Sequence, residues 1–177
     1  MRNYVYFWIE KFRSIGGMSQ KTSYLFDNYA VNLSSKYRIT HKWSKKKRIF
    51  SFQSFSENEN MIACLKDNFY SKNIIDLKVL LGDNGAGKSS IMELLSDIIS
   101  GKDSHSECTY ILVWEENGKF QYYLQKGRLY KKNKGGRGIS EIKDQIMVKS
   151  HPIFQTGKKI TSLQYYILQR FQIIGIT

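Results

Sequence analysis

Acidic residues, proline and cysteine are all scarce in this chain of 177 residues. It carries 15 Asp and Glu against 28 Lys and Arg, so its formal net charge is +13. The one proline is Pro152, where average usage predicts about nine. The two cysteines, Cys64 and Cys108, have no second ligand near either of them, which excludes a disulfide framework and a zinc knuckle. We expect both to be reduced, packed thiols of a cytosolic protein.

Long apolar runs and histidine clusters are absent as well. No segment reaches the roughly 18 apolar residues that a membrane-spanning helix needs, so we expect no membrane partner. The amino-terminal apolar segment is short, aromatic and without a small-residue cleavage site, which excludes a signal peptide and favours a cytoplasmic location. The three histidines lack metal-ligand spacing and are expected at the surface or in loops, at His41, His105 and His151.

The composition is that of one folded domain. Hydrophobic residues make up 41% and aromatic residues 14%, and disordered chains carry far fewer aromatics. Segments of β-branched and aromatic residues predict strands at 4–9, 24–26 and 49–52. Apolar residues at helical spacing predict a helical segment within 57–70. The first third of the chain is therefore predicted to be a small β-rich layer.

The second half contains one strong hairpin signal. Apolar segments at 110–115 and 120–124 flank Asn117 and Gly118, a pair typical of two-residue hairpin turns. Less regular patterns follow, and they predict a mobile basic loop at 126–138, a helix at 139–149, and a helix or strand at 161–171.

A glycine-rich segment lies between an apolar segment and an amphipathic one. Residues 76–81 predict a strand, and the apolar stripe within 91–99 predicts a helix that ends near Gly101. The segment between them satisfies G-x-x-x-x-G-K-[ST], the phosphate-binding P-loop, with a strand before it and a helix after it. The candidate nucleotide-binding residues are Gly82, Asp83, Asn84, Gly85, Ala86, Gly87, Lys88, Ser89 and Ser90.

Each fixed residue of this motif has a chemical task. Gly82, Gly85 and Gly87 permit positive φ and let backbone amides approach a phosphate without interference from a Cβ atom. The amino-terminal end of the helix adds amide groups and the positive end of its dipole. Lys88 supplies a positive charge to the β- and γ-phosphates, and Ser89 supplies a hydroxyl ligand to Mg²⁺. The sequence therefore predicts that the chain binds ATP with Mg²⁺, with Ser89 as the candidate metal ligand.

The segment 80–90 resembles the Walker A segment of ABC-type ATPases, in particular the group that contains the structural-maintenance-of-chromosomes proteins, RecF and the overcoming-lysogenization nucleases. Residues 8–15 resemble the opening strand of that group, in which Phe-Arg-Ser follows the first strand. The resemblance implies that Arg13 approaches the nucleotide phosphates, and the equally weighted alternative is a solvated arginine at a strand end. It also implies an α/β fold of the P-loop NTPase type, as a partial, ABC-ATPase-like head with a β-rich N-terminal layer.

The resemblance covers roughly the first half of the chain and implies the amino-terminal part of one ATP-binding head. Within 1–177 we expect three parts. They are a β-rich layer at 1–76, the strand, P-loop and helix at 77–101, and a hairpin, basic loop and carboxy-terminal segment at 102–177. Proteins of this group bind ATP between two heads, so the expected partner is a second ATPase head or a missing carboxy-terminal half.

The elements that such heads use for hydrolysis are not recognised in the sequence. Residues 110–116 imitate a Walker B strand, but they follow closely after Lys88, end in two glutamates and lead into the hairpin turn, so a hairpin edge strand is favoured. Residues 134–138 match the signature loop poorly, and Gln164 and Gln169 are formal Q-loop candidates. We therefore assign no catalytic residue, and we expect ATP hydrolysis only if Walker B and signature segments complete the head.

The positive charge indicates a further partner. Basic clusters at 42–48 and 126–137 interleave with aromatic residues and make nucleic acid a candidate, beside the alternative of solvated loops that balance an acidic partner. By the resemblance, the function is ATP binding in an ATPase that acts on nucleic acid in DNA repair or phage defence. Two alternatives stay open, a small P-loop nucleotide kinase and a basic nucleic-acid-binding protein with a relic P-loop. The kinase is disfavoured because kinases begin with the P-loop, whereas a long β-rich segment precedes Gly82 here.

Overall fold

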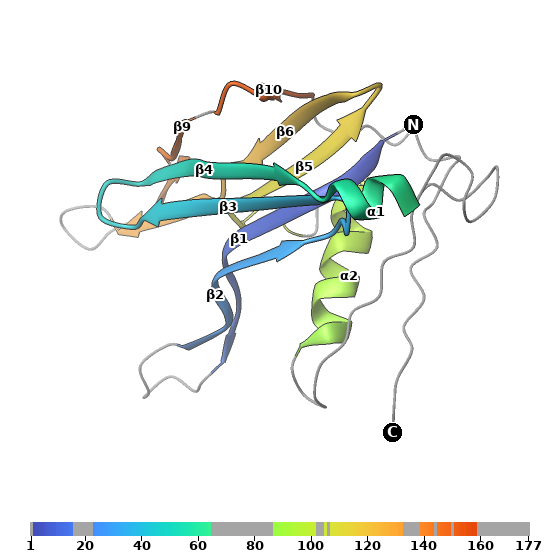
Figure 1. Ribbon diagram of the computed structural model, residues 1–177. Helices are drawn as coiled ribbons and strands as arrows, with labels where there is room; N and C mark the ends of the chain where they lie inside the picture. Colours follow the sequence, from blue (N-terminus) through green and yellow to red (C-terminus); the bar gives the residue numbers. More distant parts are fainter. Residues whose placement is uncertain are drawn as a thin grey trace.

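The structure is a computed structural model that describes residues 2–15, 23–64, 87–101, 105, 107–132, 139–143, 145–149 and 151–158. Strands predominate in this part of the chain (Figure 1). The strands are β1 (Asn3–Ile15), β2 (Ser23–Asn32), β3 (Tyr37–Ser44), β4 (Ile49–Glu57), β5 (Tyr110–Glu116), β6 (Lys119–Gln125), β7 (Arg128–Lys132), β8 (Ile139–Lys143), β9 (Met147–Lys149) and β10 (Phe154–Thr156). The helices are α1 (Glu59–Cys64) and α2 (Lys88–Ile99).

A five-stranded sheet with the order β10-β6-β5-β1-β2 forms the centre of the described part. β1 lies between β2 and β5 and is antiparallel to both, whereas the short β10 pairs with β6 in parallel. Residues 4–9 of β1 are β-branched or aromatic, and every one of them is buried. Such residues favour a strand that is covered on both faces, so the strand predicted at 4–9 is confirmed.

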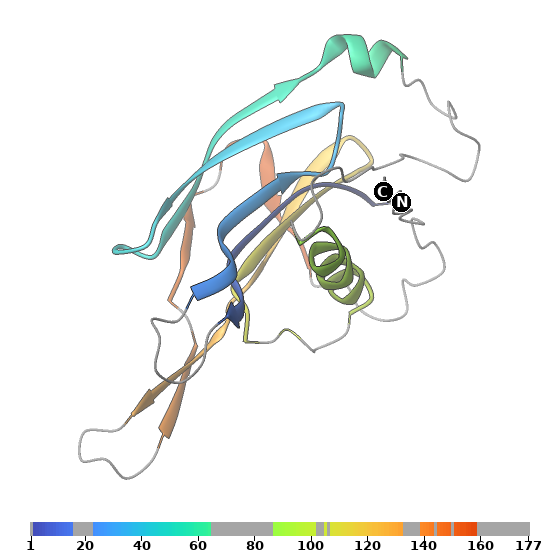
Figure 2. The same ribbon diagram turned by 90° about the horizontal axis from the view of Figure 1, so that it is seen from below.

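Different elements cover the two faces of this sheet. On one face, α2 packs its apolar stripe against residues of β1, β2 and β5, including Phe7 and Leu112. On the other face lies a three-stranded sheet with the order β3-β4-β9, and Trp8 and Phe50 pack together in the core between the two sheets. Figure 2 shows α2 and the β3–β4 pair on opposite sides of the central sheet. Burial on both faces explains why the interior strands are so apolar.

The predicted hairpin is present as β5 and β6, which pair from Tyr110 opposite Gln125 to Glu116 opposite Lys119. The turn residues have positive φ at both positions, 53° at Asn117 and 71° at Gly118, which is the pattern of a type I′ turn. The expectation that residues 110–116 form an edge strand is wrong, because β1 pairs with the other side of β5.

Two other strand predictions are confirmed. Residues 24–26 lie in β2 and residues 49–52 lie in β4. The helical segment predicted within 57–70 is present as α1, and residues 65–70 lie outside the described part of the chain.

Two predictions in the basic region are wrong. The sequence predicts a loop over 126–138, but residues 128–132 form β7, which pairs with β8 in antiparallel fashion. The sequence also predicts a helix at 139–149, where the structure has β8 and β9 instead. Backbone hydrogen bonds form this hairpin, and they need no particular side chain, so a run of basic residues does not argue against a strand. The three-residue spacing of Ile139 and Ile142 also fits one face of a helix, and tertiary pairing decides between the two.

Several predicted segments lie outside the described residues. They are the strand at 76–81, the signature-loop candidate at 134–138 and the helix or strand at 161–171, which includes Gln164 and Gln169. The α/β P-loop fold class therefore stays a prediction. Within the described part, no helix combines the length and the apolar character needed to cross a membrane.

The two thiols have different surroundings. Both cysteines are free, but Cys64 is exposed and Cys108 is half-buried, so the expectation of a packed thiol is wrong for Cys64. Burial, together with the negative charge of Glu107, raises the pKa of Cys108 to about 11. Because the thiolate is the reactive form, Cys108 is a poor nucleophile at neutral pH.

His41 departs from the expectation that the histidines lie at the surface or in loops. It lies on β3 and is half-buried against the central sheet, with its ring stacked on Phe50 at a centroid distance of 5.1 Å. Its Nδ1 atom is 2.7 Å from the hydroxyl oxygen of Tyr6. Burial disfavours the charged imidazole and lowers the pKa of His41 below its usual value of 6.5.

This burial makes folding depend on pH. The unfolded chain binds a proton at His41 more tightly than the folded chain does. The contribution of neutral His41 to the free energy of unfolding is therefore fully present above about pH 6.5 and is lost as the pH falls below that value. We expect the thermal midpoint of the wild type to fall more between pH 7.5 and pH 5.5 than that of a His41→Gln variant, which cannot titrate there. Circular dichroism melts at the two pH values measure this, and equal losses in both proteins would contradict it.

Candidate nucleotide-binding site

The amino-terminal end of α2 carries the described part of the P-loop motif. The helix begins at Lys88, directly after Gly87, whose φ of 82° and ψ of 13° lie in the left-handed region. The carbonyl oxygen of Gly87 accepts a hydrogen bond from the amide of Ile91 at 2.9 Å and so starts the helical ladder. Glycine is the residue that adopts this conformation at least cost, which agrees with its place in the motif.

Contact with β2 fixes the position of this helix end. A Cβ atom added to Gly87 would lie 2.9 Å from Cζ of Phe26 and 3.9 Å from a methyl carbon of Leu25. The Phe26 ring itself stacks on Phe12, at a centroid distance of 5.9 Å, and on Tyr29, at 4.5 Å. The close approach therefore needs a residue without a side chain at 87, for reasons of space as well as of φ.

The rest of α2 explains which way the first turn faces. Ile91, Leu94, Leu95 and Ile98 are buried in the core against the central sheet. Because these positions recur every three or four residues, they hold one stripe of the helix on the sheet. Ser89 is on an exposed position of the first turn. The helix predicted to start near Lys88, with its apolar stripe within 91–99, is confirmed as α2.

The charge around the first turn suits an anion. α2 has no acidic residue in its first turn, which carries Lys88 instead. The amide groups of a first helical turn have no acceptor within the helix, and together with the helix dipole they form a region of positive potential. A phosphate placed there would interact with amides, dipole and lysine at once.

The structure brings together four of the nine predicted site residues. Gly87, Lys88, Ser89 and Ser90 follow one another at the start of α2. The other five, at 82–86, lie outside the described residues, and so does the side chain of Arg13. Sequence reasoning missed Phe26 as the residue that packs on Gly87, although the aromatic segment at 24–26 could have indicated an aromatic wall beside the motif.

The carboxy-terminal side of α2 is also tied to the sheet. The Nε2 atom of His105 is 3.1 Å from a carboxylate oxygen of Asp97, and the imidazole lies edge-on to Phe12 at a centroid distance of 5.7 Å. Phe12 stacks on Phe26 in turn. Gly87 thus lies against Phe26 directly, whereas the carboxy-terminal side of α2 is connected to Phe12 through His105, so β1 and β2 support both sides of the helix.

The Walker B alternative gains no support from β5. This strand is antiparallel to both of its neighbours and ends in the β5–β6 turn. Glu116, at that end, lies 3.5 Å from the guanidinium of Arg2, and Glu115 is paired with Phe120. Because β5 is an interior strand that leads directly into a hairpin turn, we assign neither glutamate a role with the nucleotide.

No ready-made metal centre is present among the side chains that the structure describes, since no group of three or more His, Cys, Asp or Glu residues lies together. A P-loop Mg²⁺ ion does not need one, because it takes most of its ligands from phosphates and water. A polar recess is present between the β2–β3 connection and α1, lined by Ser34, Tyr37, Arg38 and Glu57 among others. It includes no residue of α2 and is therefore separate from the candidate site.

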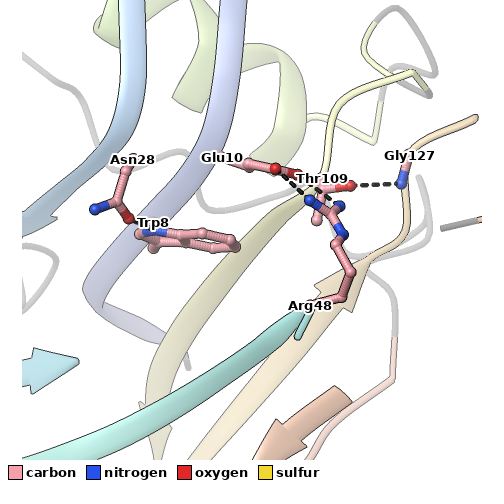
Figure 3. Close-up of polar contacts among 6 residues, drawn as sticks. All are labelled: Trp8, Glu10, Asn28, Arg48, Thr109 and Gly127. Atoms are coloured by element: carbon pink, nitrogen blue, oxygen red, sulfur yellow. Dashed lines mark hydrogen bonds and ion pairs between the residues drawn. The ribbon is translucent and has the colours of Figure 1, made fainter. Parts of the chain in front are cut away.

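A second cluster of polar contacts joins the β3–β4 hairpin to the central sheet (Figure 3). The guanidinium of Arg48 donates two hydrogen bonds to the carboxylate of Glu10, one of them at 2.7 Å from Nη2 to Oε2. The side chain of Glu10 is 10% exposed and that of Arg48 is 27% exposed. The guanidinium also lies over the ring of Trp43, 5.0 Å from its centroid. No local pattern predicts this pair, since its members are 38 positions apart along the chain.

Comparison of the chain with protein-family models, with curated proteins and with solved structures found no match.

Proposed function

We propose that the chain binds ATP with Mg²⁺ at the amino-terminal end of α2. The observation that carries the proposal is that α2 begins at the lysine of the G-x-x-x-x-G-K-S motif, with the preceding glycine in the left-handed conformation. This is the arrangement in which motif, amides and helix dipole act on one phosphate group.

Three of the four described site residues have a defined role in this proposal. Gly87 turns the chain into the helix without a side chain that would collide with Phe26. Lys88 neutralises charge on the β- and γ-phosphates, and the hydroxyl oxygen of Ser89 is a ligand of Mg²⁺. The glycines at 82 and 85 would let the remaining backbone amides surround the phosphates.

The proposal concerns binding, because no residue is assigned to position the attacking water. A P-loop orients the triphosphate, whereas turnover also needs a positioned water and, in two-headed ATPases, contacts from the opposite head. By its resemblance to the ABC-type group, the chain would contribute one ATP-binding surface to a cytoplasmic ATPase that acts on nucleic acid in repair or phage defence. Hydrolysis then depends on Walker B and signature elements from elsewhere.

Replacement of the motif lysine tests the proposal. We expect Lys88→Ala to weaken binding of Mg-ATP by about 10- to 100-fold, because a charge-assisted contact to phosphate contributes about 1.5–3 kcal/mol. Ser89→Ala is expected to retain binding of ATP without metal and to lose most of the gain that Mg²⁺ adds. Isothermal titration calorimetry with and without Mg²⁺ measures both.

An exposed lysine elsewhere supplies the matched control. Lys119→Ala removes the same charge from the exposed first residue of β6 and is expected to leave Mg-ATP affinity within about twofold of the wild type. Equal weakening by Lys88→Ala and Lys119→Ala would mean that ATP follows overall charge and would contradict the proposal. A wild type that binds DNA but no ATP would favour the relic P-loop, and transfer of phosphate to an acceptor would favour the kinase.

A further inference from the structure

The outer face of the β3-β4-β9 sheet carries a row of polar and basic residues. Lys42 of β3 pairs with Ser51 of β4, which pairs in turn with Lys149 of β9. Residues that lie opposite one another in a sheet point to the same face, so these side chains share one surface. Both lysines are exposed. The neighbouring row, which contains Trp43 and Phe50, faces the core instead.

The same outer face continues along β3 and β4. Arg38 and Thr40 alternate with buried Ile39, and both are exposed. They pair with Ser56 and Ser54, and the hydroxyls of Thr40 and Ser54 are 2.6 Å apart. Residues 37–56 and 145–149 contain no Asp or Glu. The face therefore carries cations and hydroxyl groups beside Ile49, Gln53 and the exposed Met147, and it ends at the recess where Glu57 and Glu59 appear.

Three further lysines extend this face at the turn between β3 and β4. Lys45, Lys46 and Lys47 are consecutive and exposed. Arg48 closes the turn with a φ of 53°, and its guanidinium is held by Glu10 and Trp43 as described above. The ion pair thus anchors the turn to β1. The three lysines are presented from a fixed base, which lowers the conformational entropy that a bound partner would have to remove.

We propose that this surface, formed by Arg38, Lys42, Lys45, Lys46, Lys47 and Lys149 and here named the basic face, binds the phosphate backbone of double-stranded nucleic acid. Lysine, arginine and hydroxyl side chains are the groups that contact phosphates. Arg38 and Lys42 are four positions apart along β3, a span of about 13 Å, and two strand spacings of about 5 Å each separate Lys42 from Lys149. The cations are therefore spread over a surface that can follow a charged backbone.

Two features favour a duplex over other anionic partners. Single-stranded nucleic acid is bound through bases stacked on aromatic rings, but the nearby aromatic residues Trp43, Phe50 and Phe52 belong to the core side of the sheet. A membrane surface would favour several exposed apolar side chains beside the lysines. Among the described residues, the exposed large apolar side chains are Met147 and Ile153, and Met147 alone lies on β9.

Binding of a labelled DNA duplex, measured by fluorescence anisotropy at several salt concentrations, tests the basic face. The variant is Lys45→Gln/Lys46→Gln/Lys47→Gln, and the matched control is Lys119→Gln/Lys126→Gln/Lys158→Gln, which removes the same charge from other exposed positions. We expect the first variant to lose about 10- to 100-fold in affinity and to reduce the magnitude of the slope of log K against log salt by about 2.7, because each of the three lost phosphate contacts contributes about 0.9 to that slope. The control is expected to lose less than about threefold.

Other results would overturn the proposal. Equal loss in the control variant would mean that net charge, and not this face, attracts the duplex. Tighter, salt-insensitive binding of a single strand, or binding to vesicles of phosphatidylserine with none to the duplex, would identify a different partner. The proposal is independent of nucleotide binding, so Lys88→Ala is expected to bind the duplex as the wild type does, and failure of one proposal leaves the other standing.

Discussion

Replacement of Arg48 by alanine is expected to destabilise the protein by about 3 kcal/mol. The substitution leaves the carboxylate of Glu10, which is 10% exposed, without the guanidinium that now donates two hydrogen bonds to it. An uncompensated charge in such a place costs more than the intact pair contributes, because the carboxylate has lost its contact with water. For a chain of this length the thermal midpoint would fall by about 6–12 °C.

Two further variants distinguish the loss of the Glu10–Arg48 ion pair from a general effect of substitution in this turn. Lys46→Ala, in the same turn but exposed, is expected to change stability by less than about 0.5 kcal/mol. Glu10→Leu combined with Arg48→Met removes both charges and is expected to recover much of the loss. Urea unfolding measures all three. If Arg48→Ala is as harmless as Lys46→Ala, the β3–β4 turn is not anchored by this ion pair.

Replacement of Gly87 by alanine has the second large expected effect, a loss of about 2–5 kcal/mol. Two causes add: an L-residue with a φ of 82° costs about 1–2 kcal/mol, and overpacking costs about 1–3 kcal/mol. The new Cβ atom would lie 2.9 Å from Cζ of Phe26, closer than such atoms normally approach. Because this contact sets the start of α2, binding of Mg-ATP is expected to fall as well.

Gly118 provides a control with the same backbone strain and no collision. Its φ is 71°, and nothing lies within 4 Å of the position of an added Cβ atom. Gly118→Ala is therefore expected to cost about 1–2 kcal/mol, the backbone cost alone. Adding Phe26→Leu to Gly87→Ala is expected to relieve the collision and leave the backbone cost. Equal losses for Gly87→Ala and Gly118→Ala in urea unfolding would contradict the close packing of α2 on β2.

The local patterns that predict structure well are those with one strong physical cause. Buried β-branched and aromatic residues at 4–9 predict an interior strand, and Asn117 with Gly118 predicts a hairpin, because each signal depends on near neighbours in the sequence. The P-loop motif predicts where α2 begins for the same reason. That β5 is an interior strand could not be predicted, because its position in the sheet depends on pairing with β1, about a hundred residues earlier in the chain.

The contacts that support the candidate site and the basic face are all long-range. Phe26 meets Gly87, and Arg48 meets Glu10, across connections whose path no local pattern specifies. In the basic region, by contrast, a local signal is present but predicts the wrong structure. Its lysines and glycines predict a loop from composition, but composition does not reveal that β7 finds a pairing partner in β8.

The central claim is that ATP binds at the first turn of α2, and amide chemical shifts measured by NMR during a titration with Mg-ATP test it most directly. We predict saturable shifts of the amides of Gly87, Lys88 and Ser89 in the wild type, and in Lys88→Ala we predict that the amides at these positions need about 10- to 100-fold more Mg-ATP to shift. The exposed Lys45–Lys47 turn reports non-specific attraction of ATP to positive charge and is predicted to shift little. Shifts confined to that turn, with the first turn of α2 unchanged at saturation, would contradict the account.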